Sequence, residues 1–479
     1  MPRIKLLLLV VALFPIAVQA AEPRPNVLFI MADDLRPEIS VYGSAAITPN
    51  LDRLARRSLR FERAYCQQAL CNPSRASMLT GLRPDTLGIW DLATHFRDRR
   101  PEVVTLPELF KMNGYQTRDC GKIYHNWAQK TQGDRQSWTA AEFLHFASHK
   151  DDKPQVKGEL PPDLATAPSC ECRDVPDDAY YDGRVADEAV KVLQEIKDKP
   201  FFLAVGFWKP HAPFNAPKKY WDLYQRKELP PLNPARPAGA PAMAFHDSRE
   251  ILGTPPNQIT LTPEQAAEMR HGYFANISYF DAQLGKVLDA LDASGVADRT
   301  VIVFTSDHGF HLGEHGLWAK TSNFELDARV PLLIATPGMP TAGRKSESLA
   351  ELLDLYPTLV EICRLPKPED LEGVSLVPVL KDPSKQVKQA AFTQHPRPAY
   401  YSREKAKVPT AMGLSVRTPT VRYTEWRDWK SGDTLAVELY DAEKDPAEMT
   451  NAVNDPRLAS DQAKAQAMLQ DAFPRRQRE

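Results

Sequence analysis

Asp33 and Asp34 are adjacent carboxylates that closely follow the apolar run of residues 27–31. Two like charges side by side repel each other, and a hard divalent cation with oxygen ligands is the simplest way to neutralise them. The alternative is that one aspartate caps a helix while the other is solvated, which is the commoner situation for an isolated Asp-Asp pair. The pair therefore indicates a metal site only when further ligands reach it from other parts of the chain.

Two more polar segments follow apolar runs. Lys209 and His211 come soon after residues 201–205, and Asp307-His308 comes soon after residues 301–304. In open α/β sheets, ligands bind beyond the carboxyl ends of the strands, so these segments are expected to meet Asp33 and Asp34 at one site. Taken alone, Asp307-His308 is an ordinary dipeptide, and its histidine could equally be a hydrogen-bonded core residue.

The most specific feature is the segment from Cys71 to Gly81, which reads Cys-Asn-Pro-Ser-Arg-Ala-Ser-Met-Leu-Thr-Gly. It resembles the signature of the type I sulfatase family: Cys-x-Pro-Ser-Arg, three variable residues, then Leu-Thr-Gly. Every fixed position is filled. The resemblance implies that a separate maturation enzyme oxidises Cys71 to formylglycine, an aldehyde that hydrates to a geminal diol. The structural alternative is a buried cysteine at the start of a helix.

Such a nucleophile suits a sulfate ester, which is a poor electrophile surrounded by electron-rich oxygens. Attack on sulfur needs an activated oxygen and strong neutralisation of charge. One hydroxyl of the diol can attack, and loss of the proton from the other then expels sulfate and restores the aldehyde. A serine or an unmodified cysteine has no second hydroxyl and would remain as a dead covalent adduct.

The resemblance also implies a metal shell. Asp33, Asp34, Asp307 and His308 match the family's metal ligands, and the modified Cys71 completes the set around one cation, Ca²⁺. Many sulfatases have Asn or Gln where this chain has His308. An imidazole makes the site slightly softer and leaves another divalent ion open.

The family's other catalytic positions are present as well. By resemblance, Arg75 holds the diol, and Lys122 and His125 form the Lys-x-x-His pair that contacts sulfate and the diol. Lys320 would bind sulfate from the far side, and His211 would be the general acid for the leaving alkoxide. A single lysine is more often a solvated surface residue, so these assignments depend on their co-occurrence with the Cys71 segment.

Within this family the chain resembles the iduronate-2-sulfatase branch over nearly its whole mature length. The resemblance makes Arg397 and Arg417 candidate substrate-binding residues, because the small C-terminal subdomain of that branch leans over the pocket. The chain departs from the animal enzyme at Phe310, where a Trp is familiar, and at Thr321, where a Tyr is. Both positions are expected beside the pocket. A uronate 2-O-sulfate within a sulfated oligosaccharide is the leading substrate hypothesis. The supporting stretches are residues 33–37, 83–86, 202–211, 306–320, 395–398 and 415–418.

Strands alternating with helices must position these residues. Apolar runs rich in branched residues predict buried parallel strands, and a 3.6-residue apolar repeat over 277–291 predicts a helix that ends at Gly295. This pattern indicates an α/β domain, and the resemblance implies the alkaline-phosphatase-like sulfatase fold with a large, mostly parallel mixed sheet. The predicted parallel strands are 27–31, 201–205, 301–304 and 332–335.

The sequence pattern changes after about residue 375. Four short strand-like runs and a helix near 459–472 predict a small antiparallel α+β subdomain. Residues 148–180 and 209–262 are rich in Pro and charge and are interpreted as long surface excursions. The expected organisation is a signal peptide at 1–20, a catalytic sulfatase domain at 21–375 and a C-terminal subdomain at 376–479. The strand-like runs are 392–394, 413–417, 422–426 and 437–440.

Composition and the N-terminus limit the partners and the cellular location that we expect for this protein. The chain has 479 residues, is 43% hydrophobic and carries a net charge of -2, so it has no global field to attract nucleic acid or an anionic membrane. Arg3 and Lys5, the apolar run 6–18 and a small-residue cleavage site after Ala20 indicate a signal peptide, too short for a membrane span. We therefore expect a periplasmic or secreted protein. Export permits disulfides among the six cysteines, and the state of Cys170 and Cys172 is left open.

Two other functions stay open at this point. A phosphonate monoester hydrolase or phosphodiesterase can share the fold and the formylglycine, and differs in its preference for aryl phosphonate over aryl sulfate. An inactive carbohydrate-binding relative would have no physical need for all of the catalytic side chains. Their joint presence favours a sulfatase.

Overall fold

The structure is a computed structural model that describes residues 24–126, 129–143, 170–254, 257–405 and 407–475. The expected signal peptide at 1–20 and residues 148–169 of the first expected excursion lie outside these ranges. Within them, no helix is both long enough and apolar enough to cross a membrane.

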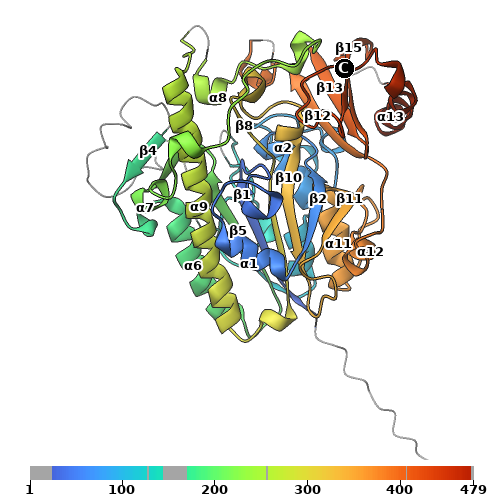
Figure 1. The fold of residues 1–479 in the computed structure, drawn as a ribbon. Helices are drawn as coiled ribbons and strands as arrows, with labels where there is room; N and C mark the ends of the chain where they lie inside the picture. Colours follow the sequence, from blue (N-terminus) through green and yellow to red (C-terminus); the bar gives the residue numbers. More distant parts are fainter. Residues whose placement is uncertain (1–23, 127–128, 144–169, 255–256, 406, 476–479) are drawn as a thin grey trace, which may run out of the picture.

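A seven-stranded sheet occupies the centre of the larger part of the molecule, in the order β11-β2-β10-β7-β1-β5-β3 (Figure 1). Strand β1 lies between β7 and β5 and is parallel to both. Strand β10 is antiparallel to both of its neighbours, so the prediction of a parallel strand at 332–335 is wrong in direction. The sheet is mixed and mostly parallel, as expected. Its strands are β1 (Asn26–Asp33), β2 (Leu59–Tyr65), β3 (Gln116–Gly121), β5 (Phe201–Pro210), β7 (Thr300–Ser306), β10 (Arg329–Ala335) and β11 (Lys345–Glu351).

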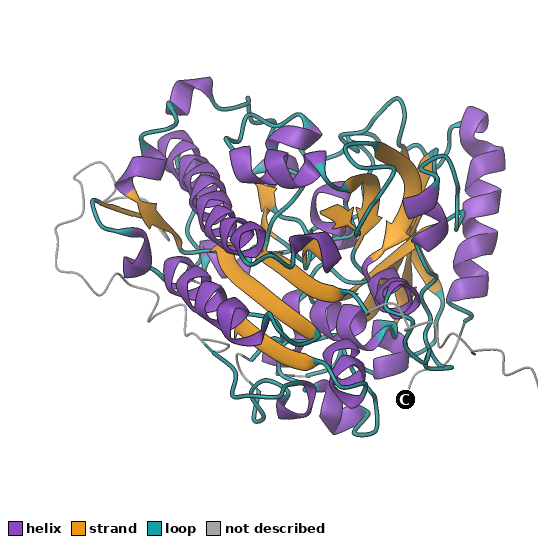
Figure 2. Cartoon of the chain, turned by 90° about the horizontal axis from the view of Figure 1, so that it is seen from below, coloured by secondary structure: helices purple, strands orange, loops and turns teal. Residues whose placement is uncertain are grey.

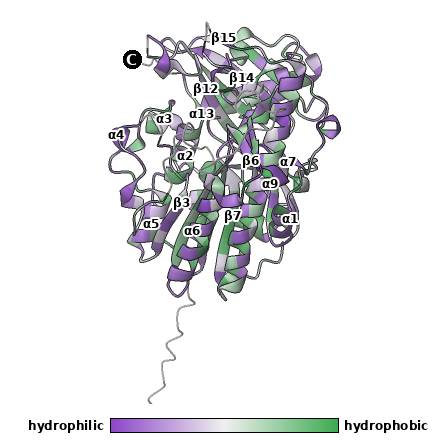
Figure 3. Cartoon of the chain, turned by 90° about the vertical axis from the view of Figure 1, so that its left-hand side faces the viewer, coloured by the Kyte–Doolittle hydropathy of each residue, from purple (hydrophilic) through white to green (hydrophobic). Residues whose placement is uncertain are grey.

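Alternate residues of the central strands enter two separate apolar cores. Leu28 and Ile30 of β1 pack on one face with helices α1 (Pro49–Arg56), α6 (Tyr181–Ile196) and α9 (Pro263–Ala293). Val27 and Phe29 pack on the other face with helices α2 (Cys71–Thr80), α5 (Leu106–Met112) and α11 (Leu355–Ile362). Figure 2 shows helices on both sides of the sheet, and Figure 3 shows polar and apolar stripes on α6.

Helix α9 confirms the helix predicted from the apolar repeat over 277–291, and extends it towards the N-terminus. Thr262 and Gln265 form a capping box at its start. Gly295, the predicted stop, has a φ of 74° just beyond the last helical residue.

A second, four-stranded antiparallel sheet forms the small C-terminal part, with strand order β12-β13-β14-β15. The strands are β12 (Ala391–Arg397), β13 (Ala411–Arg417), β14 (Val421–Asp428) and β15 (Thr434–Asp441), and helix α13 (Ala459–Ala472) packs on them through Ala465 and Leu469. In Figure 1 this part lies at the upper end of the main sheet. The predicted α+β subdomain is therefore confirmed, while its boundary at residue 376 stays a prediction.

The second expected excursion, 209–262, contains regular structure that packs against the large part. It begins inside β5, since that strand continues to Pro210, and includes β6 (Phe214–Pro217), α7 (Lys218–Trp221) and α8 (Arg249–Leu252). Strand β6 pairs with β4 (Cys170–Arg173). Cys170 and Cys172 both lie on β4, and their redox state stays open. The remaining elements are the two-residue strands β8 (His311–Leu312) and β9 (Trp318–Ala319) and the short helices α3 (Pro84–Leu87), α4 (Phe96–Arg99), α10 (Glu325–Ala328) and α12 (Val377–Lys381).

Candidate active site

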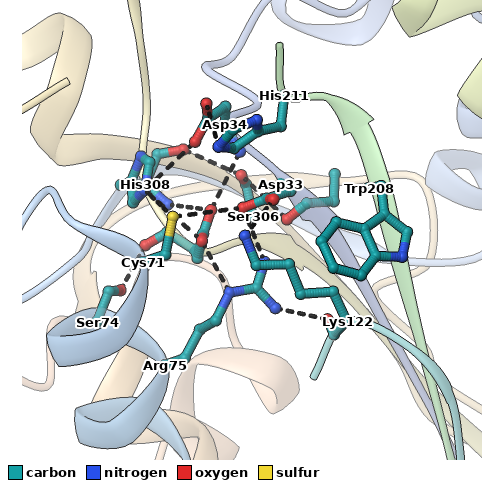
Figure 4. Close-up of polar contacts among 12 residues, drawn as sticks. Asp33, Asp34, Cys71, Ser74, Arg75, Lys122, Trp208, His211, Ser306 and His308 are labelled. Atoms are coloured by element: carbon teal, nitrogen blue, oxygen red, sulfur yellow. Dashed lines mark hydrogen bonds and ion pairs between the residues drawn. The ribbon is translucent and has the colours of Figure 1, made fainter. Parts of the chain in front are cut away.

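The carboxyl ends of β1 and β7 bring Asp33-Asp34 and Asp307-His308 together (Figure 4). Asp33 is the last residue of β1, and the backbone N–H of Asp34 donates to Asp307 Oδ1 at 3.1 Å. The N–H of Leu35 donates to Ser306 Oγ at 2.9 Å. Asp34 has a φ of 64°, in the left-handed region that non-glycine residues rarely adopt. The turn after β1 is thus held against the end of β7 with both aspartates inside.

Cys71 is the first residue of α2 and points into the same cluster. Its Sγ lies 3.7 Å from Asp33 Oδ1 and 3.4 Å from His308 Nε2. Ser74, on the first turn of α2, donates through Oγ to the carbonyl of Asp307 at 2.5 Å. The thiol is only 2% exposed. The Cys71 segment therefore reaches the carboxylates, as the sequence predicts.

Arg75 connects Asp33, at the end of β1, to Asp307, which follows β7. Its Nε donates to Asp307 Oδ2 at 2.8 Å and its Nη2 to Asp33 Oδ1 at 3.1 Å, while Nη1 donates to the carbonyl of Lys122 at 2.5 Å. All three side chains of the ion pairs are fully buried. A buried carboxylate is costly unless it is paired, so Arg75 contributes both charge compensation and orientation.

Lys122 enters the cluster from the end of β3. Its Nζ lies 2.5 Å from Asp33 Oδ2 and 5.3 Å from the ring centre of Trp208. The preceding residue must be glycine, because a Cβ on Gly121 would lie 2.0 Å from the carbonyl oxygen of Gly206 on β5. His125 is also buried, and neither of its ring nitrogens has a hydrogen-bond partner among the described residues.

Lys320 and His211 lie on the opposite side, at Asp34. Lys320 Nζ is 3.0 Å from both carboxylate oxygens of Asp34 and 3.2 Å from His211 Nε2. His211 Nδ1 donates to the carbonyl of Ala212 at 2.5 Å, which leaves Nε2 facing the cluster, 3.6 Å from Asp34 Oδ2. The side chains of Lys320 and His211 thus lie together next to the carboxylate of Asp34.

Glu250, on α8, is part of this arrangement and was missed from the sequence. Its Oε1 accepts from Lys320 Nζ at 2.7 Å and lies 3.1 Å from His211 Nε2, while the hydroxyl of Tyr400 donates to Oε2 at 3.1 Å. No motif marks Glu250, which lies in the segment interpreted as a surface excursion. Its carboxylate contacts the two side chains expected to bind sulfate and protonate the leaving group.

The surroundings shift the pKa values of the residues in the cluster in different directions. Burial works against the charge of Asp33, but Lys122, His211 and Arg75 lower its pKa well below the ordinary value. Burial also opposes protonation of His211, yet Asp34 and the other nearby carboxylates raise its pKa to about 10. Burial raises the pKa of the Cys71 thiol. An unmodified Cys71 is thus a protonated thiol and a weak nucleophile.

The donor set fits a hard divalent cation. Carboxylate oxygens of Asp33, Asp34 and Asp307 all lie within 4.8 Å of one another, as do ligand atoms of Asp34, Cys71 and His308. His308 Nδ1 donates to the carbonyl of Gly309 at 2.9 Å, which leaves Nε2 facing Asp34 at 3.4 Å and Asp307 at 3.6 Å. Oxygen-rich sites of this kind suit calcium.

The two arginines from the C-terminal part lie in different places. Arg397 is 8% exposed and donates through Nη1 at 3.0 Å to the carbonyl of Thr321, the residue after Lys320. Arg417 instead pairs with Glu325 at 3.2 Å, and the structure does not bring it into the cluster. The cluster does contain Asp33, Asp34, Cys71, Arg75, Lys122, His211, Asp307, His308 and Lys320.

The two expected departures beside the pocket also differ. Phe310 is fully buried and stacks on Tyr273 at 5.7 Å between ring centres, and its position beside the pocket stays a prediction. Thr321 is buried next to Lys320, with its N–H donating to the carbonyl of Ala69 at 3.1 Å. Thr321 therefore adjoins the site through Lys320.

Comparison with known proteins agrees with this geometry. The profile of the sulfatase family matches residues 25–363, and the profile described as N-sulphoglucosamine sulphohydrolase, C-terminal, matches residues 313–475. Iduronate 2-sulfatase of Mus musculus is 35% identical and that of Homo sapiens 34% identical, each over 90% of this chain and 91% of the relative.

The phosphonate monoester hydrolase of Agrobacterium radiobacter has the same fold, with a TM-score of 0.74 at 24% identity over 94% of this chain and 95% of that chain. The predicted sulfatase fold is therefore confirmed. With a family profile over most of its length and these relatives along almost all of it, the chain belongs to the sulfatase family, beside the iduronate 2-sulfatases, and is a sulfuric ester hydrolase.

Proposed function

We propose that this sulfatase hydrolyses a sulfate ester of a sulfated carbohydrate, with a uronate 2-O-sulfate as the leading candidate. The catalytic group is formylglycine made from Cys71, held beside one divalent cation, Ca²⁺. The observation that carries the proposal is the position of Cys71 Sγ, 3.7 Å from Asp33 and 3.4 Å from His308 at the start of a buried helix. A thiol there gains nothing from packing among charged groups, whereas an oxygen nucleophile would gain activation from them.

Asp33, Asp34, Asp307 and His308 would hold the cation, which supplies charge neutralisation and lowers the pKa of an oxygen bound to it. The hydrated formylglycine supplies one hydroxyl to attack sulfur and a second whose deprotonation releases sulfate. The side chains around them perform the remaining steps.

Arg75 fixes Asp33 and Asp307 through its Nη2 and Nε, and so keeps the ligand oxygens in register. Lys122 and Lys320 approach the carboxylates from two sides, which suits binding of the sulfate oxygens between them. His211 Nε2 is the proton donor to the leaving alkoxide, since its raised pKa keeps it charged at neutral pH. Burial lowers the pKa of His125 well below the ordinary value, which keeps the ring neutral, so that it can contact the sulfate and the diol through hydrogen bonds.

The sugar assignment is supported by the printed function of the relatives, iduronate 2-sulfatase, and by the similarity over 90% of this chain. We propose that the substrate is a sulfated oligosaccharide of the glycosaminoglycan type. Arg397 is retained as a substrate-side candidate because it contacts Thr321 next to Lys320. Arg417 is a weaker candidate, since Glu325 neutralises it away from the cluster.

We also propose that the chain is exported through the signal peptide at 1–20 to the periplasm or the medium, and that a formylglycine-generating enzyme acts on it. N-terminal sequencing of the mature protein should start after Ala20. A mature protein that retains residues 1–20 in solution would contradict the export proposal.

Peptide mass spectrometry over residues 66–83 tests the modification, and Cys71→Ser tests its role. The variant should fold like the wild type and lose multiple-turnover hydrolysis of 4-nitrophenyl sulfate, because a single hydroxyl cannot release sulfate. Cys363→Ser is the matched control, since Cys363 is another buried free thiol, beside the carbonyl of Pro25. Sustained turnover by Cys71→Ser, or faster wild-type turnover of an aryl phosphonate than of the aryl sulfate, would refute the proposal.

A further inference from the structure

A separate pocket of about 330 Å³ lies beside the catalytic cluster, between the segment before α8 and the end of β12. Three arginines line it, Arg236, Arg249 and Arg397, against a single carboxylate, Asp247. Asp247 and Glu404 neutralise Arg249. Arg236 and Arg397 have no carboxylate within ion-pair distance anywhere in the described ranges. The three arginines and the two carboxylates leave an excess of positive charge at the pocket, although the chain as a whole has none.

Two connections join this pocket to the catalytic cluster. Tyr400 lines the pocket, and its hydroxyl donates to Glu250, which in turn accepts from Lys320 Nζ. Arg397 also lines the pocket and donates to the carbonyl of Thr321, directly after Lys320. The pocket is therefore joined to Lys320 through Glu250 and Tyr400 on one path and through the backbone of Thr321 on the other.

Arg397 is a buried charge without a counter-ion. Backbone carbonyls accept its N–H groups: Met243 at 2.7 Å, and Ala244, Thr321 and Pro396 at 3.0 Å each. These contacts satisfy hydrogen bonds, and the Trp426 ring lies 4.7 Å from the guanidinium, but no carboxylate forms an ion pair with this buried charge. Burial lowers the pKa of Arg397 to about 10. An anion in the adjoining pocket would offset this cost.

His246 adds an unsatisfied donor. Its Nδ1 accepts from the backbone N–H of Ser248 at 2.9 Å, so Nε2 carries the proton of the neutral ring. That Nε2 is buried and has no partner in the described part of the chain. At the mouth, the exposed guanidinium of Arg236 lies 4.5 Å from the ring centre of Phe245, on the pocket wall. His246, Arg236 and Arg397 thus all line one pocket, and neither arginine has an ion-pair partner in the described part of the chain, which suits an anionic ligand.

We propose that this pocket is a second anion-binding subsite, which receives a carboxylate or an additional sulfate group of the sulfated oligosaccharide whose ester is cleaved at Cys71. Arg397 supplies the fixed charge, His246 Nε2 a hydrogen bond and Arg236 a charge at the entrance. The inference rests on the proposed carbohydrate substrate and deepens it, because it requires a second anionic group near the scissile ester.

The test compares kcat/KM for two substrates in the purified full-length enzyme. One is 4-nitrophenyl sulfate, which has a single anionic group, and the other is a disaccharide with a 2-O-sulfated uronate. Arg236→Gln and His246→Leu should each reduce the ratio of disaccharide to aryl sulfate kcat/KM about tenfold, mainly through KM, because charge-assisted hydrogen bonds to the second anion are lost. Arg135→Gln removes an exposed arginine outside the pocket and should keep the wild-type ratio.

Two modified disaccharides identify the anion. If it is the uronate carboxylate, its methyl ester should lower wild-type turnover and abolish the difference between wild type and variants. If it is an additional sulfate on the neighbouring sugar, a disaccharide without that sulfate should do the same. Arg397→Lys is a further variant, interpreted only if it unfolds in urea like the wild type.

Wild-type selectivity in both Arg236→Gln and His246→Leu, or an equal loss with both substrates, would overturn the inference. So would a neutral sugar amide turned over like the carboxylate in the absence of any second sulfate. These outcomes differ from failure of the proposed function, in which the wild type would not hydrolyse 4-nitrophenyl sulfate at all.

Discussion

Replacement of Glu250 by Gln should make inorganic sulfate a stronger inhibitor. Glu250 Oε1 lies 2.7 Å from Lys320 Nζ and 3.1 Å from His211 Nε2, so its carboxylate competes for the groups that would bind the sulfate. The glutamine side chain in this variant keeps the shape and a carbonyl oxygen but loses the negative charge. Removing that charge should favour a bound anion.

The magnitude follows from the contacts. A sulfate oxygen that accepts from Lys320 Nζ at about 2.8 Å would lie about 5 Å from Glu250 Oε1. Two unit charges at about 5 Å repel by about 1 kcal/mol in water and about 3 kcal/mol at an effective dielectric constant of about 20. The Glu250 side chain is 20% exposed, so we take about 1.4 kcal/mol, which is a tenfold change in affinity.

The assay is competitive inhibition of 4-nitrophenyl sulfate hydrolysis by sodium sulfate at constant ionic strength. The Ki of sulfate should fall about tenfold in Glu250→Gln, and the difference should shrink at high salt because exposed charges are screened. Glu404→Gln is the matched control. Glu404 forms an ion pair with Arg249, the residue before Glu250 on α8, and has no ion pair with Lys320. An unchanged or higher Ki in Glu250→Gln would refute the reasoning, because Glu250 would then leave its position when the anion binds.

Two further predictions concern stability. Arg75→Met should reduce the free energy of unfolding of the metal-free protein by about 3–5 kcal/mol in urea titrations, because Asp33 and Asp307 lose a buried partner; a loss below about 1 kcal/mol would contradict this. Burial opposes the charge of Glu351, but Arg83 and Lys388 lower its pKa to about 2. A lowered pKa stabilises the folded state above the unfolded pKa of about 4.5, and this stability, about 3 kcal/mol, is lost as the pH falls towards 2. Glu351→Gln should therefore flatten the dependence of unfolding free energy on pH below 4.5, and a wild-type slope in the variant would show that other groups cause it.

The central part of the site was predictable because each element of it is local or follows from strand polarity. Asp33-Asp34 and Asp307-His308 directly follow apolar runs, and parallel strands place such residues at one edge of the sheet. The Cys71 segment begins a helix whose first turn faces that edge. Local pattern and sheet topology therefore suffice to bring Asp33-Asp34 and Asp307-His308 together, whereas the role of Cys71 and of the metal ligands followed from the resemblance to the sulfatase signature.

The direction of β10 could not be predicted in this way. Its run of buried apolar residues reports burial on both faces, which is the same whether the strand is parallel or antiparallel. The direction depends on the path of the chain after His308, through β8, β9 and α10, and those short elements have no hydrophobic period.

Glu250 and Arg417 show the limit for single side chains. The position of Glu250 depends on the route of a segment of more than forty residues, and a glutamate in a polar stretch is ordinarily solvated. Arg417 ends a strand of the C-terminal sheet, but its side chain faces Glu325, so proximity of the subdomain did not give proximity of the guanidinium. Both outcomes depend on tertiary packing that no local pattern encodes.

The charges of the site explain why a cation and the substrate anion should bind together. At neutral pH the cluster is close to neutral without a metal ion, so an incoming sulfate ester gains little net attraction from it. In this state Lys122 pairs with Asp33 and Lys320 with Asp34. The four carboxylates are Asp33, Asp34, Asp307 and Glu250, and the four cations are Arg75, Lys122, Lys320 and His211.

A divalent ion at the carboxylates would add two positive charges and release Lys122 and Lys320 towards the sulfate. We therefore expect chelation to weaken binding of inorganic sulfate at least tenfold, measured by calorimetry, and added Ca²⁺ to restore it. Asp307→Asn should weaken Ca²⁺ binding and with it the recovery of sulfate affinity. Sulfate affinity that is the same in chelator and in Ca²⁺ would mean that the lysines are already available to the anion, and the charge argument would fail.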